Sequence, residues 1–284
     1  MRINWYPGHM AKARRMMEDS LKLVDAVIEI VDARIPAAGR NPDFDTLFSR
    51  KKRIIILNKS DLAIKEATKA WIKYYTDKGW HAMHYDATRK GGKGAVASLI
   101  QQAVSELLEK AAAKGMKKTI RCLVAGIPNS GKSTFINSMS AQARARTGDT
   151  PGVTRGKQWV SISPYLELLD TPGVLWPKLE NQSHAAHLAY VGSINDDIMD
   201  VEELAAMLLS ELISIVPDAV MERYGVDKDT PMEIMLDEAC KRRGFLLSGG
   251  RLDTARAAGI ILDEFRAGRL GRVTLERPEE GGGL

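Results

Sequence analysis

The chain has 284 residues, of which 44% are hydrophobic and 27% are charged, a balance typical of a folded globular protein with one large or two medium domains. No apolar run approaches the ~18 residues of a membrane span, and two cysteines, Cys122 and Cys240, are too few for a disulfide framework or a zinc site. The first residues lack the apolar core of a signal peptide, so we expect a cytoplasmic protein without membrane association.

The first part of the chain alternates strand-like and helix-like segments. Apolar runs at residues 26–31, 53–57 and 81–85 predict three strands, and residues 96–113 predict a helix. Alternation of this kind predicts a largely parallel sheet that is flanked by helices.

The second predicted strand leads directly into Asn58-Lys59-Ser60-Asp61. An aspartate carboxylate can accept two hydrogen bonds, from N1–H and the N2 amino group of guanine, whereas adenine offers no such pair of donors. Asn58 can bridge the base and a phosphate loop, and the Lys59 stem can cover the ring face. The segment resembles the N-K-x-D guanine-binding motif of the GTPase superfamily, with Asn58, Lys59 and Asp61 as guanine-binding residues.

The third predicted strand leads into a weaker candidate, Tyr85-Asp86-Ala87-Thr88. This segment resembles the S-A-K loop that supports guanine binding in GTPases. Because Asp-Ala-Thr stands in place of Ser-Ala-Lys, we expect more from the backbone N–H of Ala87 than from any side chain, Asp86 included.

Residues 126–134 have the spacing G-x-x-x-x-G-K-S, between a predicted strand at 119–125 and a helix-like run at 134–139. This is the setting of a phosphate-binding loop. The glycines let backbone N–H groups close around a phosphate, and the helix N-terminus adds partial positive charge. Lys132 can reach the β- and γ-phosphates, and the Ser133 hydroxyl can bind Mg²⁺. The predicted phosphate-binding residues here are Asn129, Ser130, Gly131, Lys132, Ser133 and Thr134.

Two later segments resemble the switches of a GTPase. Residues 148–154 look like switch I, where Thr154 is predicted as the second Mg²⁺ hydroxyl and Thr150 is the alternative. Predicted strands at 158–162 and 166–169 precede Asp170-Thr171-Pro172-Gly173, which resembles the D-x-x-G element. In that element Asp170 would hold Mg²⁺ through water, and the Gly173 N–H would bind the γ-phosphate.

The strand signal fades after about residue 180. Apolar residues repeat at helical spacing over residues 201–216 and again over 257–265, while Thr230-Pro231-Met232-Glu233 predicts a capped helix start. We therefore expect two domains, an α/β domain over residues 1–178 and a small all-helical domain over residues 185–280.

The order of the motifs is unusual, since the guanine motif precedes the phosphate loop and the D-x-x-G element follows it. The same loops in rotated order are a circular permutation, which is tolerated when the former termini lie close together. Several other segments support a resemblance: Trp5–Met10, Asp32–Pro36, Asp170–Pro177 and Leu247–Gly250. Over nearly its whole length the chain resembles the circularly permuted GTPases of ribosome assembly.

The resemblance implies a P-loop GTPase domain, a helical C-terminal domain that binds RNA, and Mg²⁺ with GTP as substrate. It also implies that a monomer binds the precursor of the large (50S) ribosomal subunit, with its rRNA and ribosomal proteins, in the GTP state and leaves after hydrolysis. Asn129 resembles the asparagine of potassium-dependent GTPases, which implies K⁺ beside the phosphates. The alternative is that Asn129 only suits the backbone shape of the loop.

Charge is unevenly distributed along the chain. Residues 1–180 carry 30 basic and 17 acidic side chains, residues 181–284 carry 11 and 19, and residues 241–277 carry 9 and 4. A cationic first domain and a basic C-terminal end favour a polyanionic partner such as rRNA, with binding that weakens steeply with salt. The basic clusters are Lys12/Arg14/Arg15, Arg50–Arg53, Arg89/Lys90/Lys93, Lys117/Lys118/Arg121, Arg144/Arg146 and Lys241–Arg243.

The position after D-x-x-G is Val174, whereas Ras-like enzymes carry there a glutamine that aims the attacking water. Slow hydrolysis without a partner is therefore expected. Our candidate for the missing group is His9, because imidazole can orient water and titrates near neutral pH. The alternative is that His9 caps a helix or contacts rRNA.

Two rival functions remain. Apolar Val174 would also suit a nucleotide-gated RNA-binding protein with negligible turnover, and a signalling GTPase that acts on another protein would leave the cationic surface unused.

Overall fold

The computed structural model describes residues 10–89, 91–140, 158–175 and 181–278. The α/β part contains α1 Met10–Leu21, β1 Ala26–Asp32, α2 Asp43–Leu47, β2 Lys52–Asn58, α3 Lys65–Asp77, β3 His81–His84, α4 Lys93–Ala103, α5 Ser105–Ala112, β4 Ile120–Ala125, α6 Lys132–Met139, β5 Gln158–Ser163 and β6 Leu166–Asp170. The helical part contains α7 Gln182–Tyr190, η1 Asp196–Ile198, α8 Val201–Ile215, α9 Pro217–Tyr224, η2 Met232–Ile234, α10 Met235–Arg243 and α11 Thr254–Arg266.

One six-stranded sheet organises the α/β part, with strand order β3-β2-β1-β4-β6-β5. All neighbouring pairs are parallel except β5 with β6, which is antiparallel. The carboxyl ends of β1, β2, β3, β4 and β6 therefore lie along one edge, where the loops that follow them meet. The largely parallel sheet predicted from the sequence is confirmed.

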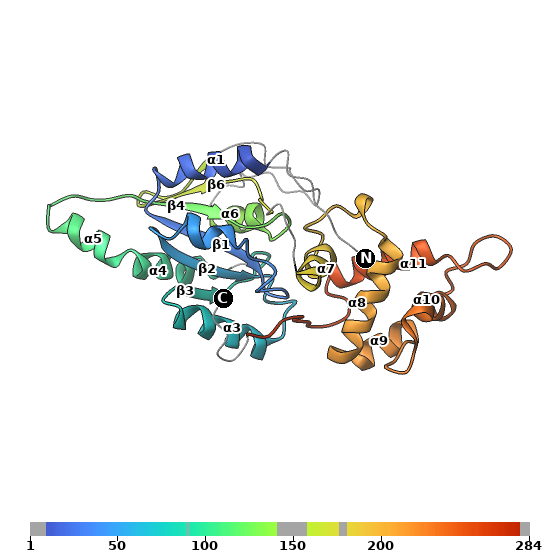
Figure 1. Ribbon diagram of the computed structural model, residues 1–284. Helices are drawn as coiled ribbons and strands as arrows, with labels where there is room; N and C mark the ends of the chain where they lie inside the picture. Colours follow the sequence, from blue (N-terminus) through green and yellow to red (C-terminus); the bar gives the residue numbers. More distant parts are fainter. Residues whose placement is uncertain (1–9, 90, 141–157, 176–180, 279–284) are drawn as a thin grey trace.

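Helices cover both faces of the sheet, as the nearly continuous apolar character of its central strands β1, β2 and β4 requires (Figure 1). On one face α4 and α6 pack on Ile28, Ile54 and Val124, and on the other α1, α2 and α3 pack on Val27, Val31 and their neighbours. The alternation of strand side chains between the two faces thus fills one core on the first face and two on the second.

Two local expectations were wrong in detail. The helix predicted over residues 96–113 is two helices, because the chain bends at Val104, whose ψ is 17° at a φ of −111°. The predicted capping box at Thr230 does not form, because the Thr230 hydroxyl donates to Asp227 Oδ1 at 2.9 Å; a helical turn, η2, nevertheless begins at Met232 and leads directly into α10 at Met235.

The helical part packs beside the loop edge of the sheet and shares a core with it (Figure 1). Its apolar side chains from α7, α8, α9 and α11 form one cluster, which also contains Ile35, Ile127 and Leu175 from the α/β part. Ile127 belongs to the phosphate loop and Leu175 follows D-x-x-G, so the helical part contacts the predicted site directly.

After α11 the chain leaves the helices and returns along the α/β part to α3 (Figure 1). The Val273 N–H donates to Leu62 O at 2.9 Å, and the Leu275 N–H donates to Arg34 O at 2.8 Å. Residues 270–276 thus lie against the loops that follow β1 and β2. Among the helices of the described residues, none has the length and apolar character needed to cross a membrane.

Candidate functional site

The loop between β4 and α6 has the backbone shape of a phosphate cradle. Gly126 and Gly131 have φ angles of 148° and 90°, and Asn129 has a φ of 58°, so three residues adopt the left-handed region that favours glycine and asparagine. Lys132 is buried at the start of α6, where its Nζ donates to Ile127 O at 2.6 Å across the loop. The sequence prediction of strand, loop and helix is confirmed here.

The end of β2 brings Asn58 onto this loop. Its Nδ2 donates to Ser130 O at 3.0 Å, and its Oδ1 accepts the Ala87 N–H at 3.3 Å. One buried amide therefore connects the predicted guanine motif, phosphate loop and supporting loop. Gly131 is needed for this approach, since a Cβ there would lie 2.4 Å from Asn58 Nδ2.

The two other predicted guanine-binding side chains of the motif lie around this bridge. Lys59, at a φ of 55°, donates from Nζ to Asn129 O at 2.8 Å. Asp61 is exposed two residues farther on, and its backbone oxygen accepts a hydrogen bond from Arg272 Nε at 3.2 Å. The motif that was separated from the phosphate loop by some seventy positions in sequence thus lies directly beside it.

Asp86 is placed differently from the others. Its Oδ1 accepts hydrogen bonds from the N–H and the hydroxyl of Thr88, at 2.9 and 2.6 Å, so the carboxylate supports its own turn. The supporting loop is nevertheless fixed beside the site, because Ser60 donates from both its N–H and its hydroxyl to Tyr85 O.

No role was predicted from the sequence for Asp32 or Arg34, which belong to one of the segments that support the family resemblance. Asp32, at the end of β1, forms a salt bridge with Lys59 at 3.1 Å and a double hydrogen bond with Arg34 at 2.8 and 3.0 Å. Burial alone would raise the pKa of Asp32, but the charges of Arg34 and Lys59 lower it, so the carboxylate stays ionised. The sequence signal that could have identified them is a pair of opposite charges at the end of a buried strand.

The D-x-x-G segment follows β6 and lies against the phosphate loop. Ser133 Oγ approaches Asp170 Oδ2 at 3.5 Å, and the Val174 N–H donates to Gly126 O at 3.2 Å. A Cβ on Gly173 would lie 2.7 Å from Pro128 N and 2.9 Å from Lys132 Nζ, so only glycine fits. The Val174 side chain is buried in the apolar cluster of α1 and α2, and it has no polar group that could hold water.

The donors around Asp170 fit a magnesium ion. Asp170 Oδ1 is buried without a hydrogen-bond partner in the described chain, and a carboxylate beside a hydroxyl is a typical donor set for a hard cation. Among the described residues, no cluster of three or more His, Cys, Asp or Glu side chains is placed to hold a metal ion.

Burial shifts the pKa values of Lys132 and Asp170, which attract each other in the site. It lowers the pKa of Lys132 to about 8, against the attraction of Asp170, and raises the pKa of Asp170, against the attraction of Lys132. An incoming phosphate would raise the pKa of Lys132 again, because a nearby negative charge favours the ammonium form.

The helical part holds the phosphate loop from the other side. Asn129 Nδ2 donates to Gly192 O at 2.6 Å, and Ser193 Oγ donates to Pro128 O at 2.8 Å, both at the end of α7. The Asn129 amide nitrogen thus joins the loop to the helical part, and the contact of its side chain with K⁺ stays a prediction. Three predicted site residues, His9, Thr154 and its alternative Thr150, lie outside the described residues.

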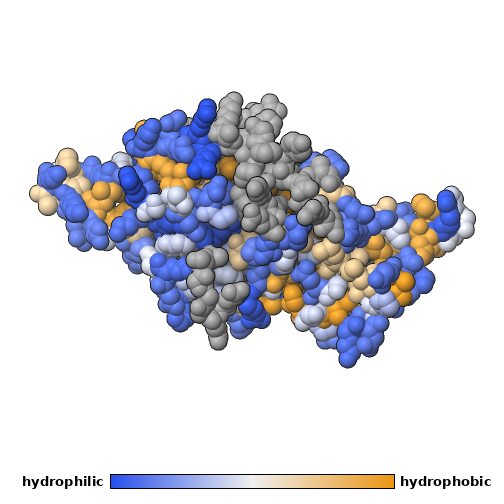
Figure 2. Space-filling view, in the orientation of Figure 1, coloured by the Kyte–Doolittle hydropathy of each residue, from blue (hydrophilic) through white to orange (hydrophobic). Residues whose placement is uncertain are grey.

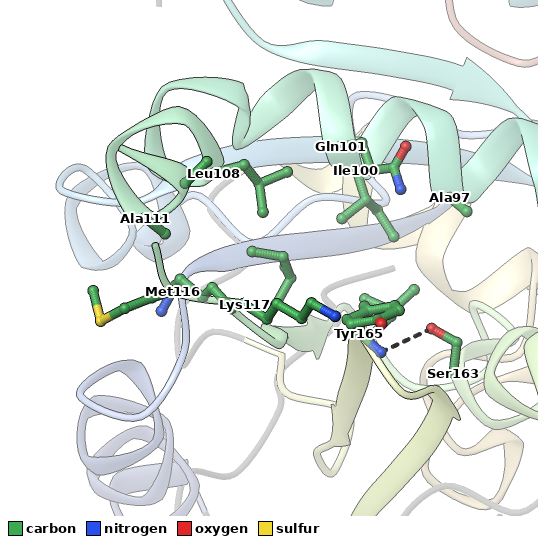
Figure 3. Close-up of a pocket in the computed structure, with 13 residues that line it drawn as sticks. Ala97, Ile100, Gln101, Leu108, Ala111, Met116, Lys117, Ser163 and Tyr165 are labelled. Carbon is green, nitrogen blue, oxygen red and sulfur yellow. Dashed lines mark hydrogen bonds between the residues drawn. The ribbon is translucent and has the colours of Figure 1, made fainter. Parts of the chain in front are cut away.

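A pocket of about 440 Å³ lies at the opposite end of the sheet (Figure 3). Ile100 and Leu108 project into it from α4 and α5, across from Lys117 and Tyr165. It also contacts Ile120 and Leu166, the first residues of β4 and β6, whereas the motifs follow the last ones. This pocket is therefore separate from the candidate nucleotide site.

Comparison with known proteins identifies the family. Residues 121–237 match a family described as "50S ribosome-binding GTPase". The chain is 43% identical over 285 residues to ribosome biogenesis GTPase A of Bacillus cereus, covering 99% of this chain and 96% of that protein, and 34% identical to the Thermotoga maritima protein, covering 98% and 95%.

The fold comparison agrees with the sequence comparison. The crystal structure of GNP-bound YlqF from T. maritima matches with a TM-score of 0.67 at 28% identity, over 95% of this chain and 99% of that one. GDP-bound YlqF matches with a TM-score of 0.65. The predicted circular permutation and GTPase fold are confirmed, and the chain belongs to the ribosome biogenesis GTPase A family of circularly permuted GTPases.

Proposed function

We propose that this GTPase is an assembly factor of the large (50S) ribosomal subunit. It binds the precursor particle through rRNA and ribosomal proteins in the GTP state, and it leaves after hydrolysis. The names of the relatives support the ribosomal role. The observation that carries the nucleotide part is Asn58, because its amide joins the N-K-S-D loop to the phosphate loop at 3.0 Å, so one nucleotide can engage both.

In this proposal Asp61 reads guanine while Asn58 and Lys59 shape the base site and the Ala87 loop closes it. The N–H groups of residues 129–134 and of Gly173 surround the phosphates, with Lys132 as the principal cation. The close approach of Gly173 to Lys132 supports this arrangement, since both would contact the γ-phosphate side of the loop.

Two cations complete the proposed site. Ser133, Asp170 and Thr154 would hold Mg²⁺, which when bound neutralises charge on the β- and γ-phosphates. Asn129 would contact K⁺ through its side-chain oxygen, which is compatible with donation from its nitrogen to Gly192.

The residue after Gly173 has no side-chain group that could activate the attacking water. Because Val174 is buried among apolar side chains, we propose that a group from elsewhere orients the water, and that His9 is this group. Turnover without the ribosomal particle should then be slow.

The basic clusters differ in what they offer an RNA. Arg15, Arg50, Lys52, Arg89 and Lys117 are exposed on the α/β part, whereas Arg53 is buried between Glu29 and Asp45. In the helical part Lys241 and Arg242 are exposed as well, and Arg243 is half-buried against Glu264. We therefore propose that both parts offer cations to RNA phosphates, in a cytoplasmic monomer.

The end of the helical part offers a different surface. Figure 2 shows apolar patches at the end where the loop between α10 and α11 lies, and Leu246 and Leu247 are 52% and 44% exposed there. Exposed apolar side chains of this kind suit contact with a ribosomal protein better than contact with phosphate.

An alternative function is a nucleotide-gated RNA-binding protein with little turnover. The buried, apolar Val174 favours it, since nothing at this position can aim water.

One experiment separates these functions: GTP turnover measured with and without purified precursor 50S particles, in KCl and in NaCl at equal ionic strength. The assembly-factor proposal predicts at least tenfold stimulation by the particles, and the K⁺ proposal predicts faster turnover in KCl. Equal rates in the two salts would remove K⁺ from the site. Particle binding without stimulated turnover would support the alternative.

A further inference from the structure

The segment Leu270–Glu276, named here the C-terminal strap, lies along the back of the N-K-S-D loop. Arg272 Nε donates to Asp61 O at 3.2 Å, the Val273 N–H donates to Leu62 O at 2.9 Å, and Thr274 Oγ accepts the Ile64 N–H at 3.0 Å. Three consecutive strap residues thus bond to three of the four residues that begin with Asp61.

The other end of the strap is anchored on the loop that follows β1. The Leu275 N–H donates to Arg34 O at 2.8 Å. The Glu276 carboxylate accepts the N–H groups of Ala37 and Ala38 at 2.5 and 3.1 Å. The strap is therefore fixed between the carboxyl ends of β1 and β2.

Packing reinforces this attachment. A Cβ on Gly268 would lie 2.5 Å from Leu62 Cδ2, so α11 ends in close contact with the same loop. Trp71 Nε1 of α3 donates to Glu276 O at 3.1 Å, and Val273 is buried. The contact is a packed interface, with hydrogen bonds at both ends.

The loop needs such support because little regular structure restrains it. Between Asn58 and Lys65 the chain forms turns, and Lys59 holds a left-handed φ of 55°. Affinity that depends on one carboxylate at a defined place is lost when the loop is mobile, since ordering it costs free energy on binding.

We propose that Thr274 and Glu276 are positioning residues for guanine selection, acting through the N-K-S-D loop without touching the nucleotide. The inference rests on the proposed role of Asp61. Glu276 also contacts His187 Nδ1 of α7 at 2.8 Å, so the helical part and the base-reading loop share an anchor.

The test compares dissociation constants for GDP and ADP by competition with a fluorescent nucleotide, on the full chain. Thr274→Val keeps the side-chain shape but leaves the Ile64 N–H without its acceptor. The proposal predicts that GDP affinity falls about fivefold, the effect of one hydrogen bond. ADP, which depends on the phosphate loop, should bind unchanged. Thr274→Ser should restore GDP affinity.

Two further variants control the comparison. Thr254→Val removes a 2.6 Å contact with Glu202 inside the helical part and should leave GDP affinity unchanged. Glu276→Ala and Glu211→Ala each remove a partner of His187, but only Glu276 also holds Ala37 and Ala38. GDP affinity should therefore fall in Glu276→Ala and stay unchanged in Glu211→Ala.

Unchanged GDP affinity in Thr274→Val, or an equal loss for GDP and ADP, would overturn the proposal, whatever happens to the folding of Glu276→Ala. Failure of the underlying function is visible separately. If Asp61→Asn leaves the ratio of GDP to ADP affinity unaltered, the guanine-reading role itself is wrong.

Discussion

At the scale of single residues, the site depends on close approaches that only particular side chains permit. Asn58 reaches the phosphate loop because Gly131 has no Cβ, and Gly173 lies against Pro128 for the same reason. The nucleotide motifs therefore constrain each other by shape as well as by their separate chemistry.

Replacing Gly131 by alanine should uncouple the two loops. The new Cβ would meet Asn58 Nδ2 at 2.4 Å and displace the amide from Ser130 O, so we expect GDP affinity to fall at least tenfold by calorimetry. Gly115→Ala is the matched control, with a similar φ of 69° and no atom within 4 Å of the new Cβ. It should cost about 1 kcal/mol of stability and leave GDP affinity unchanged. Equal GDP affinities in both variants would contradict the coupling.

His9 gives a second prediction at this scale. His9→Ala should leave GTP affinity nearly intact and lower particle-stimulated turnover by ~10²-fold or more, the usual contribution of a general base or water-orienting imidazole. Single-turnover measurements with precursor particles would test it, and normal stimulated turnover in the variant would remove His9 from the mechanism.

At the scale of elements, the features that depend on local sequence patterns were predictable. Buried strands appear in the sequence as apolar runs, and a phosphate loop needs its glycines at fixed spacing. The strands, the motifs and the largely parallel sheet could therefore be predicted. The strap was not predictable, because Leu275 meets Arg34 across more than two hundred positions and no periodicity marks such a pair. The division at Val104 was missed because the apolar pattern continues through it.

One connection between elements should respond to pH. His187 of α7 lies between Glu211 of α8 and Glu276 of the strap, at 3.0 and 2.8 Å. Burial alone would lower the pKa of His187, but these two carboxylates raise it from 6.5 to about 9. The protonated form therefore stabilises the fold fully below pH 6.5, and this contribution is lost as the pH rises to about 9.

Urea unfolding at pH 6.5 and pH 9 would measure the effect. The wild-type chain should lose on the order of 3 kcal/mol of unfolding free energy between these values through this group, and His187→Gln should lose correspondingly less. His184→Gln, on the same helix with its ring 6.5 Å away, is the control and should retain the wild-type dependence. An identical pH dependence in the wild type and His187→Gln would show that the histidine does not clamp these elements.

At the scale of the whole molecule, the helical part is attached to the nucleotide site through several contacts. Asn129 and Ser193 connect the phosphate loop to the end of α7, and the strap connects the base-reading loop to the end of α11. Leu175, just after D-x-x-G, lies in the core of the helical part. In the proposed switch, a change of nucleotide that moved these loops would act on the helical part through covalent and packed contacts together.

One guanine nucleotide is proposed to engage both the N-K-S-D loop and the phosphate loop. Calorimetric titration of the wild type and of Asp61→Asn with GDP, ADP and xanthosine diphosphate would test this. We expect a strong preference of the wild type for GDP, and a shift of that preference toward xanthosine diphosphate in the variant, because an amide can donate to the xanthine oxygen. ADP binding as tightly as GDP, or an unaltered preference in Asp61→Asn, would contradict it.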